Sequence, residues 1–145
     1  MRFIIIISIL FFCCKQKTNL KTDAQSSMNT TASPTEQKVF FKNLNNGDTL
    51  ISPFFVEMGV FGMKIKPAGE PEAGTGHHHI VIDEGFVSFG EIIPMDKTHL
   101  HYGKGDTIAK IELAQGEHTL TLQFANGMHV SYGEQFSSTI NIYVK

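Results

Sequence analysis

The chain has 145 residues, which allows one domain of ordinary size and no more. Its formal net charge at pH 7 is −2 and no basic cluster stands out, so we expect no nucleic-acid partner. The two cysteines, Cys13 and Cys14, both lie near the N-terminus. The rest of the chain therefore excludes an internal disulfide and a metal site built on thiolates.

The first 14 residues have the features of a signal peptide. Arg2 precedes an apolar run, 3–12, which at roughly 10 residues is too short for a bilayer that needs about 20. A cysteine directly after such a run is typical of lipoproteins, in which the acylated thiol anchors the chain to the membrane. We favour Cys14 because a small residue precedes it, with Cys13 as the alternative. The sequence thus predicts an exported lipoprotein of the cell envelope, in the periplasm or at the cell surface. A secreted form without an anchor is the alternative.

Residues 15–37 are rich in Lys, Thr, Ser, Asn and Gln, with Leu20 and Met28 as the only sizeable apolar side chains. Such a segment buries too little apolar surface to offset the entropy lost on ordering, so we expect a disordered polar tether. Residues 38–145 then form the folded domain, which is large enough for a single core.

Strand patterns recur through this domain, separated by clusters of Gly, Pro, Asn and Asp. The clearest is 118–124, where His118, Leu120, Leu122 and Phe124 share one face. The other predicted strands are 39–44, 49–52, 54–61, 78–83, 107–113 and 140–144. We interpret the domain as all-β: a single antiparallel β-sandwich of seven to eight short strands, immunoglobulin-like in outline, with a small barrel as the alternative. One apolar face per strand argues against a parallel sheet buried on both faces.

All seven histidines lie in this domain, and four of them form two pairs. In extended chain, residues two apart project to the same side, so His77 and His79 make one same-face pair and His99 and His101 a second. Two imidazoles at this spacing can reach one metal ion. These four residues are the predicted ligands.

Two further residues are candidate ligands. Asp83 shares the phase of His77 and His79, as an oxygen ligand or as an orienting partner of a ring, and His129 follows the Asn126-Gly127 turn. Imidazole and carboxylate suit copper(II) or zinc. Three methionines are optional soft ligands for copper(I): Met63, Met95 and Met128.

The sequence leaves other functions open. Histidines at strand ends often fix loops by binding backbone carbonyls, so the alternative is a non-catalytic adhesion or scaffold module that binds an envelope partner. His118 in particular is interpreted as a core-edge residue. Because no serine has a G-x-S-x-G context, we do not expect an enzyme; a zinc hydrolase is the third possibility, and it would need an open metal position beside a carboxylate base.

Several motifs, in order, resemble DUF4399, a family of bacterial exported domains of unknown function. They are Gly62-Met63, Pro67-Ala68-Gly69, Gly74 to His79, Ile82-Asp83, Ile93-Pro94, Thr98 to Gly105, Gly116 to Leu120 and Asn126 to His129. The resemblance implies no activity. At the level of fold, the family is similar to small immunoglobulin-like envelope domains, some of which handle copper. The family pattern has a second histidine three positions after His129, where this chain has Tyr132, which implies a weaker or altered ligand set.

Overall fold

The computed structural model describes residues 38–145. The predicted signal peptide, the tether and both cysteines lie outside the described residues. Among residues 38–145 there are nine strands and one short 3-10 helix, η1 (Glu134–Phe136). The strands are β1 (Lys38–Phe41), β2 (Asp48–Leu50), β3 (Phe54–Phe61), β4 (Lys64–Ile65), β5 (Thr75–Ile82), β6 (His99–His101), β7 (Ile108–Ile111), β8 (Gly116–Ala125) and β9 (Ser137–Val144).

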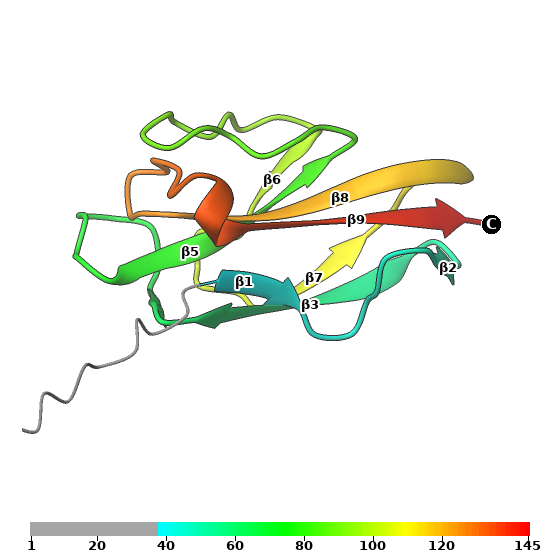
Figure 1. Cartoon of the computed structure of the whole chain (residues 1–145), viewed down its shortest axis with the longest axis horizontal. Coiled ribbons are helices and arrows are strands. Elements are labelled where there is room, and N and C mark those ends of the chain that lie inside the picture. The colour runs from blue at the N-terminus through cyan, green and yellow to red at the C-terminus, as the bar shows by residue number, and fades with distance from the viewer. Residues whose placement is uncertain (1–37) are drawn as a thin grey trace, which may run out of the picture. The chain divides into compact units, whose positions relative to one another are not determined.

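The strands form two sheets, so the all-β prediction is confirmed (Figure 1). The smaller sheet has the order β1-β3-β7 and is antiparallel throughout. The larger has the order β2-β9-β8-β5-β4, with β6 also paired to β5. The prediction of a purely antiparallel arrangement is wrong, because β2 pairs with β9 and β4 with β5 in parallel. The immunoglobulin-like outline stays a prediction.

Both sheets contribute one face to a common hydrophobic core. On β3, Phe54, Val56 and Met58 are buried while Phe55 and Glu57 between them are exposed, as the alternation of a half-buried strand requires. The larger sheet supplies the other side of the core from three strands. Its buried apolar side chains there are Ile80, Ile82, Leu120, Leu122, Phe124, Ile140, Ile142 and Val144.

Strand β5 differs from the others because all eight of its residues are buried. On its outer face the rings of His77 and His79 pack against those of His101 and His129. The segment 83–98 lies on the same side of the sheet, where it is held to β8 and to the turn after it. The side chain of Gln123 accepts a hydrogen bond from the Val87 amide (3.1 Å), and the Ser131 hydroxyl donates to the Val87 carbonyl (2.8 Å). The larger sheet therefore has an inner face in the core and an outer face beneath a long loop.

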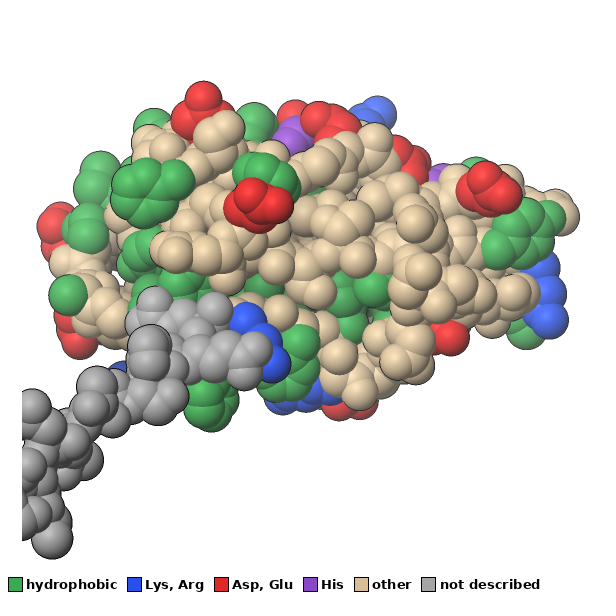
Figure 2. All heavy atoms as spheres, viewed as in Figure 1, with side chains coloured by type: hydrophobic (Ala, Val, Ile, Leu, Met, Phe, Trp, Pro, Cys, Tyr) green, Lys and Arg blue, Asp and Glu red, His purple; other side chains and the backbone are tan. Residues whose placement is uncertain are grey.

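In the space-filling view, histidine side chains show only small areas of surface on the face presented (Figure 2). Within residues 38–145, no helix is both long enough and apolar enough to cross a membrane.

Candidate metal centre

Four histidines from three separate segments meet beside the outer face of the larger sheet. His77 and His79 come from β5, His101 from β6, and His129 from the turn that follows β8. The first two project to the same side because they are two residues apart on a strand. The antiparallel register then places His101 directly opposite His79. We call these four residues the histidine cluster.

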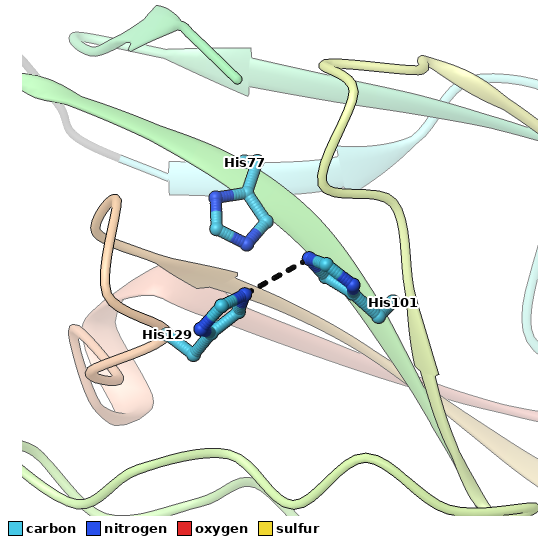
Figure 3. Close-up of side chains that lie close together, drawn as sticks. All are labelled: His77, His101 and His129. Atoms are coloured by element: carbon cyan, nitrogen blue, oxygen red, sulfur yellow. Dashed lines mark hydrogen bonds between the residues drawn. The ribbon is translucent and has the colours of Figure 1, made fainter. Parts of the chain in front are cut away.

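The rings of the cluster are packed tightly against one another. All six separations between ring centroids fall between 4.6 and 5.8 Å. The Nε2 atoms of His77 and His79 are 3.0 Å apart, and those of His101 and His129 are 3.1 Å apart. One ligand atom each from His77, His101 and His129 lies within 4.8 Å of the other two, and Figure 3 shows the three rings turned toward a common point.

The environment favours the neutral form of three rings of the cluster. Burial, followed by the neighbouring rings of His101 and His129, lowers the pKa of His77 to about 4. Burial also lowers the pKa of His79 to about 2, with further lowering from the adjacent histidines, and it lowers the pKa of the exposed His101 as well. A neutral imidazole has the free lone pair that a metal ion requires, so His77, His79 and His101 are in their metal-binding protonation state.

The position of the His101 ring depends on the residue two places later. A Cβ atom built on Gly103 would lie 2.1 Å from Nε2 of His101 and 2.2 Å from Cε1. The ring therefore occupies space that any other residue at position 103 would fill. Because Gly103 has no side chain, the His101 ring can lie along its own strand and point toward His77.

His129 is held by a tight turn in an uncommon backbone conformation. Its φ of 65° lies in the left-handed region, which costs a non-glycine residue about 1–2 kcal/mol. The Asn126 side-chain oxygen accepts hydrogen bonds from the amides of Met128 (2.9 Å) and Val130 (3.0 Å) and so fixes the turn. Strained conformations that the surroundings enforce concentrate at functional sites, which is consistent with a binding role for this ring.

The loop between β4 and β5 is hydrogen-bonded to the turn after His101 and to the turn that carries His129. The Ala68 amide donates to the Gly103 carbonyl (2.8 Å), and the Gly69 amide donates to the Gly127 carbonyl (2.9 Å). Residues 67–69, which we call the strap, thus link the turn after His101 to the turn before His129. The backbones approach so closely that a Cβ on Gly127 would lie 2.3 Å from the Gly69 oxygen.

Two predicted ligands lie outside the cluster. His99 pairs with Val81 across β5 and β6, two residues further along the strands than the pair of His79 and His101. Its Nδ1 lies 2.9 Å from Oδ1 of Asp96 instead of facing the other rings. The expectation of four ligands from two H-x-H pairs therefore does not match the placement of His99. The same-face phase is right, but the register separates the two positions.

Asp83 is also placed elsewhere, because β5 ends at Ile82 and Asp83 has a φ of 57°, which breaks the alternation assumed for it. Its carboxylate accepts hydrogen bonds from the Thr119 amide and from Nδ1 of His118, both at 2.9 Å. The His118 ring also contacts the Ala114 carbonyl through Nε2 (3.0 Å), so both of its nitrogens are engaged. This placement agrees with the interpretation of His118 as a structural residue at the edge of the core.

Tyr132, at the position where the resemblance led us to expect a second histidine, packs away from the cluster. Its ring stacks near Phe124 and Phe136, and its hydroxyl donates to the Thr75 carbonyl (2.8 Å). Tyr132 therefore serves packing and leaves the ligand set unchanged. Of the candidate soft ligands, Met63 packs against the core, while Met95 and Met128 are exposed.

Sequence reasoning did not single out Gly103 or Asn126 as parts of the site. The glycine could not be recognised because its role depends on where the His101 ring lies. Asn126 carried a signal, the Asn-Gly pair, but it was interpreted only as a turn.

A family model described as Domain of unknown function (DUF4399) matches residues 56–145. The matched segment includes all four histidines of the cluster, together with Gly103, Asn126 and the strap. No curated protein and no solved structure has significant similarity to the chain.

Proposed function

Since the chain belongs to the DUF4399 family, whose description assigns no activity, we propose its function from the site: the domain binds a divalent metal ion, zinc or copper(II), through His77, His101 and His129. The observation that carries the proposal is the approach of one ligand atom from each residue to within 4.8 Å of the other two. Bound to one ion at 2.0–2.1 Å, tetrahedral imidazole nitrogens would lie roughly 3.3 Å apart. The 3.1 Å between Nε2 of His101 and Nε2 of His129 is already close to this value.

The alternative, a scaffold whose histidines only pin loops, is less well supported at this site. Loop-fixing histidines direct their ring nitrogens at backbone carbonyls, as His118 does with Ala114. In the histidine cluster, by contrast, the hydrogen-bond-distance neighbours of the ring nitrogens are other ring nitrogens. Ring nitrogens that face one another in this way are arranged as the ligands of one metal ion would be.

The test is calorimetric titration of the untagged protein with Zn(II) and Cu(II). The proposal expects binding much tighter than millimolar, lost or strongly weakened in His101→Ala and His129→Ala. His99→Ala is the matched control, since His99 lies on the same strand as His101 and outside the cluster. Millimolar or weaker binding, or equal affinity in all three variants, would reject the proposal.

We further propose that the domain works in the cell envelope as a lipoprotein anchored through Cys14. What supports this is the sequence of residues 1–14, which lie outside the described structure. Labelled palmitate should be incorporated into the wild-type chain in a bacterial host and not into Cys14→Ala, with Cys13→Ala as the control. Equal labelling of Cys14→Ala would contradict the assignment to Cys14.

A further inference from the structure

We infer that His79 is a fourth ligand, so that the metal centre is a closed tetrahedral site of four imidazoles suited to zinc. The inference rests on the proposed function and specifies its coordination. It follows from two independent features: the hydrogen-bonding state of the His79 ring and the arrangement of all four rings.

The first feature is that metal binding at His77 would leave His79 without a partner. Figure 3 shows that the ring nitrogen of His77 facing His101 and His129 is the one farther from its Cβ, Nε2. That same atom is the 3.0 Å neighbour of Nε2 of His79. A nitrogen that donates its lone pair to a metal can neither donate nor accept a hydrogen bond, so coordination ends this contact.

The consequence for His79 is severe because its side chain is fully buried. Its Nδ1 already has no hydrogen-bond partner among the described residues, and the residue is 0% exposed. With Nε2 also released, both polar atoms of the ring would be buried and unsatisfied, which is strongly unfavourable. Binding of Nε2 to the same ion gives that atom a partner again and leaves only Nδ1 unsatisfied, as before, and 3.0 Å is a separation that two ligands of one ion can have.

The second feature is the geometry of the four rings. An imidazole bound at 2.0–2.1 Å has its centroid roughly 3.2 Å from the ion, so tetrahedral ligands have centroids roughly 5.2 Å apart. Square-planar ligands would instead give four separations of roughly 4.5 Å and two of roughly 6.4 Å. The observed separations run from 4.6 to 5.8 Å, with three of the six at 5.1 Å, and so are closer to the tetrahedron than to the square. The ligand atoms that already lie within 4.8 Å of one another are those of His77, His101 and His129, so the His79 ring would turn toward the ion as it binds.

A closed tetrahedral shell of ligands determines which metal the site prefers and whether the metal can be catalytic. It suits zinc and denies copper(II) the tetragonal geometry that this ion prefers. It also leaves no position for a water molecule, whereas catalytic zinc has three protein ligands and an open fourth site. The centre therefore holds the metal ion or stabilises the fold, and it does not catalyse hydrolysis of a substrate.

The experiment uses cobalt(II) as a spectroscopic substitute for zinc in the untagged protein. The wild-type protein with one equivalent of Co(II) should show the intense visible absorption of four-coordinate cobalt, and added azide should not change it. His79→Gln should weaken zinc binding at least roughly tenfold, since outer-shell partners alone are worth about 10- to 100-fold. Its cobalt spectrum should become sensitive to azide, while His99→Gln behaves as wild type.

The outcomes separate this inference from the proposed function. If wild-type protein binds zinc tightly but its cobalt spectrum responds to azide, and His79→Gln matches wild type, the site has three ligands and the inference is wrong while the proposed function stands. If wild-type protein binds neither ion, both are wrong. Should His79→Gln fail to fold, the azide response of wild-type protein decides alone.

Discussion

Gly103 contributes to the metal centre because it has no side chain. The His101 ring lies where a side chain at position 103 would begin, with its Nε2 at 2.1 Å from an ideal Cβ. The conformation of Gly103 is not among the positive-φ backbones, so alanine is permitted there as far as the backbone is concerned. An added methyl group would therefore displace the exposed end of His101 and leave the fold intact.

We predict that Gly103→Ala weakens zinc affinity by about 10- to 100-fold, the range found for residues that orient ligands. The midpoint of thermal unfolding without metal should change little. Gly85→Ala is the matched control, because a Cβ at position 85 meets nothing within 4 Å. Unchanged affinity in Gly103→Ala, measured by competition with a chromogenic chelator, would show that His101 does not bind from its observed position.

For single residues, the sequence predicted which face of a strand a side chain lies on better than it predicted which residues lie beside it. The i to i+2 rule correctly placed His77 with His79 and His99 with His101 on common faces. It could not show that β6 pairs with β5 so that His101, not His99, lies opposite His79, because register is set by long-range pairing. It also failed at Asp83, where a left-handed backbone turns the side chain toward His118.

Strand β5 places three consecutive histidines in buried surroundings, and this has a cost in stability. His78 faces the core against Phe124, and neither of its ring nitrogens has a hydrogen-bond partner among the described residues. Burial, with a contribution from Lys42, lowers the pKa of His78 to about 4. The folded state thus holds neutral rings that the unfolded chain would protonate.

We predict that the metal-free domain loses stability as pH falls from about 6.5 to about 4. In this window the unfolded state binds more protons than the folded state, so the free energy of unfolding falls with pH by up to about 1.4 kcal/mol per pH unit for each buried ring. His118 acts in the opposite direction, since hydrogen bonds to Asp83 and Ala114 raise its pKa against the effect of burial. Urea denaturation at several pH values, with chelator present, measures the slope.

His78→Leu provides the matched variant for this prediction. It replaces an unsatisfied buried ring by an apolar side chain outside the histidine cluster, so stability at pH 5 should rise and the slope should decrease. A slope equal to that of wild type would show that His78 is not neutral and buried in the folded protein.

The strap is the element that couples the two turns of the site. The 2.3 Å approach of the Gly69 oxygen to an ideal Cβ of Gly127 involves backbone on both sides, which cannot swing away. We predict that Gly127→Ala lowers the free energy of unfolding by about 1–3 kcal/mol, the usual cost of overpacking. It should also weaken metal binding through His129. A variant as stable as wild type in denaturant titration would mean that the strap does not hold this turn.

Long strands were easier to predict from the sequence than short ones. The eight-residue β3 was predicted with its observed bounds, and the predicted strand 118–124 lies within β8, because both alternate over many residues. Strands β4 and β6 were missed, since two or three residues carry no periodic signal and their pairing with β5 is decided by tertiary contacts. The second buried face of β5 was missed because its outward rings pack against His101 and His129, which the sequence does not place beside them.

Considered as a whole, the domain uses the two faces of its larger sheet for different purposes. The inner face completes the hydrophobic core with β1, β3 and β7, and the histidine cluster lies on the outer face. The ligands of the proposed site come from β5, β6 and the turn after β8, so they can meet only when these three segments are in their native positions. Metal binding should therefore report on the fold of the entire domain.

The most direct test of the metal centre is a nuclear magnetic resonance spectrum of the histidine ring nitrogens, recorded before and after one equivalent of Zn(II). The proposed site predicts that Nε2 of His77, His101 and His129 shifts to values typical of zinc-bound nitrogen, while His99 and His118 remain unchanged. Shifts confined to His99 or His118, or no shift at any ring, would contradict it.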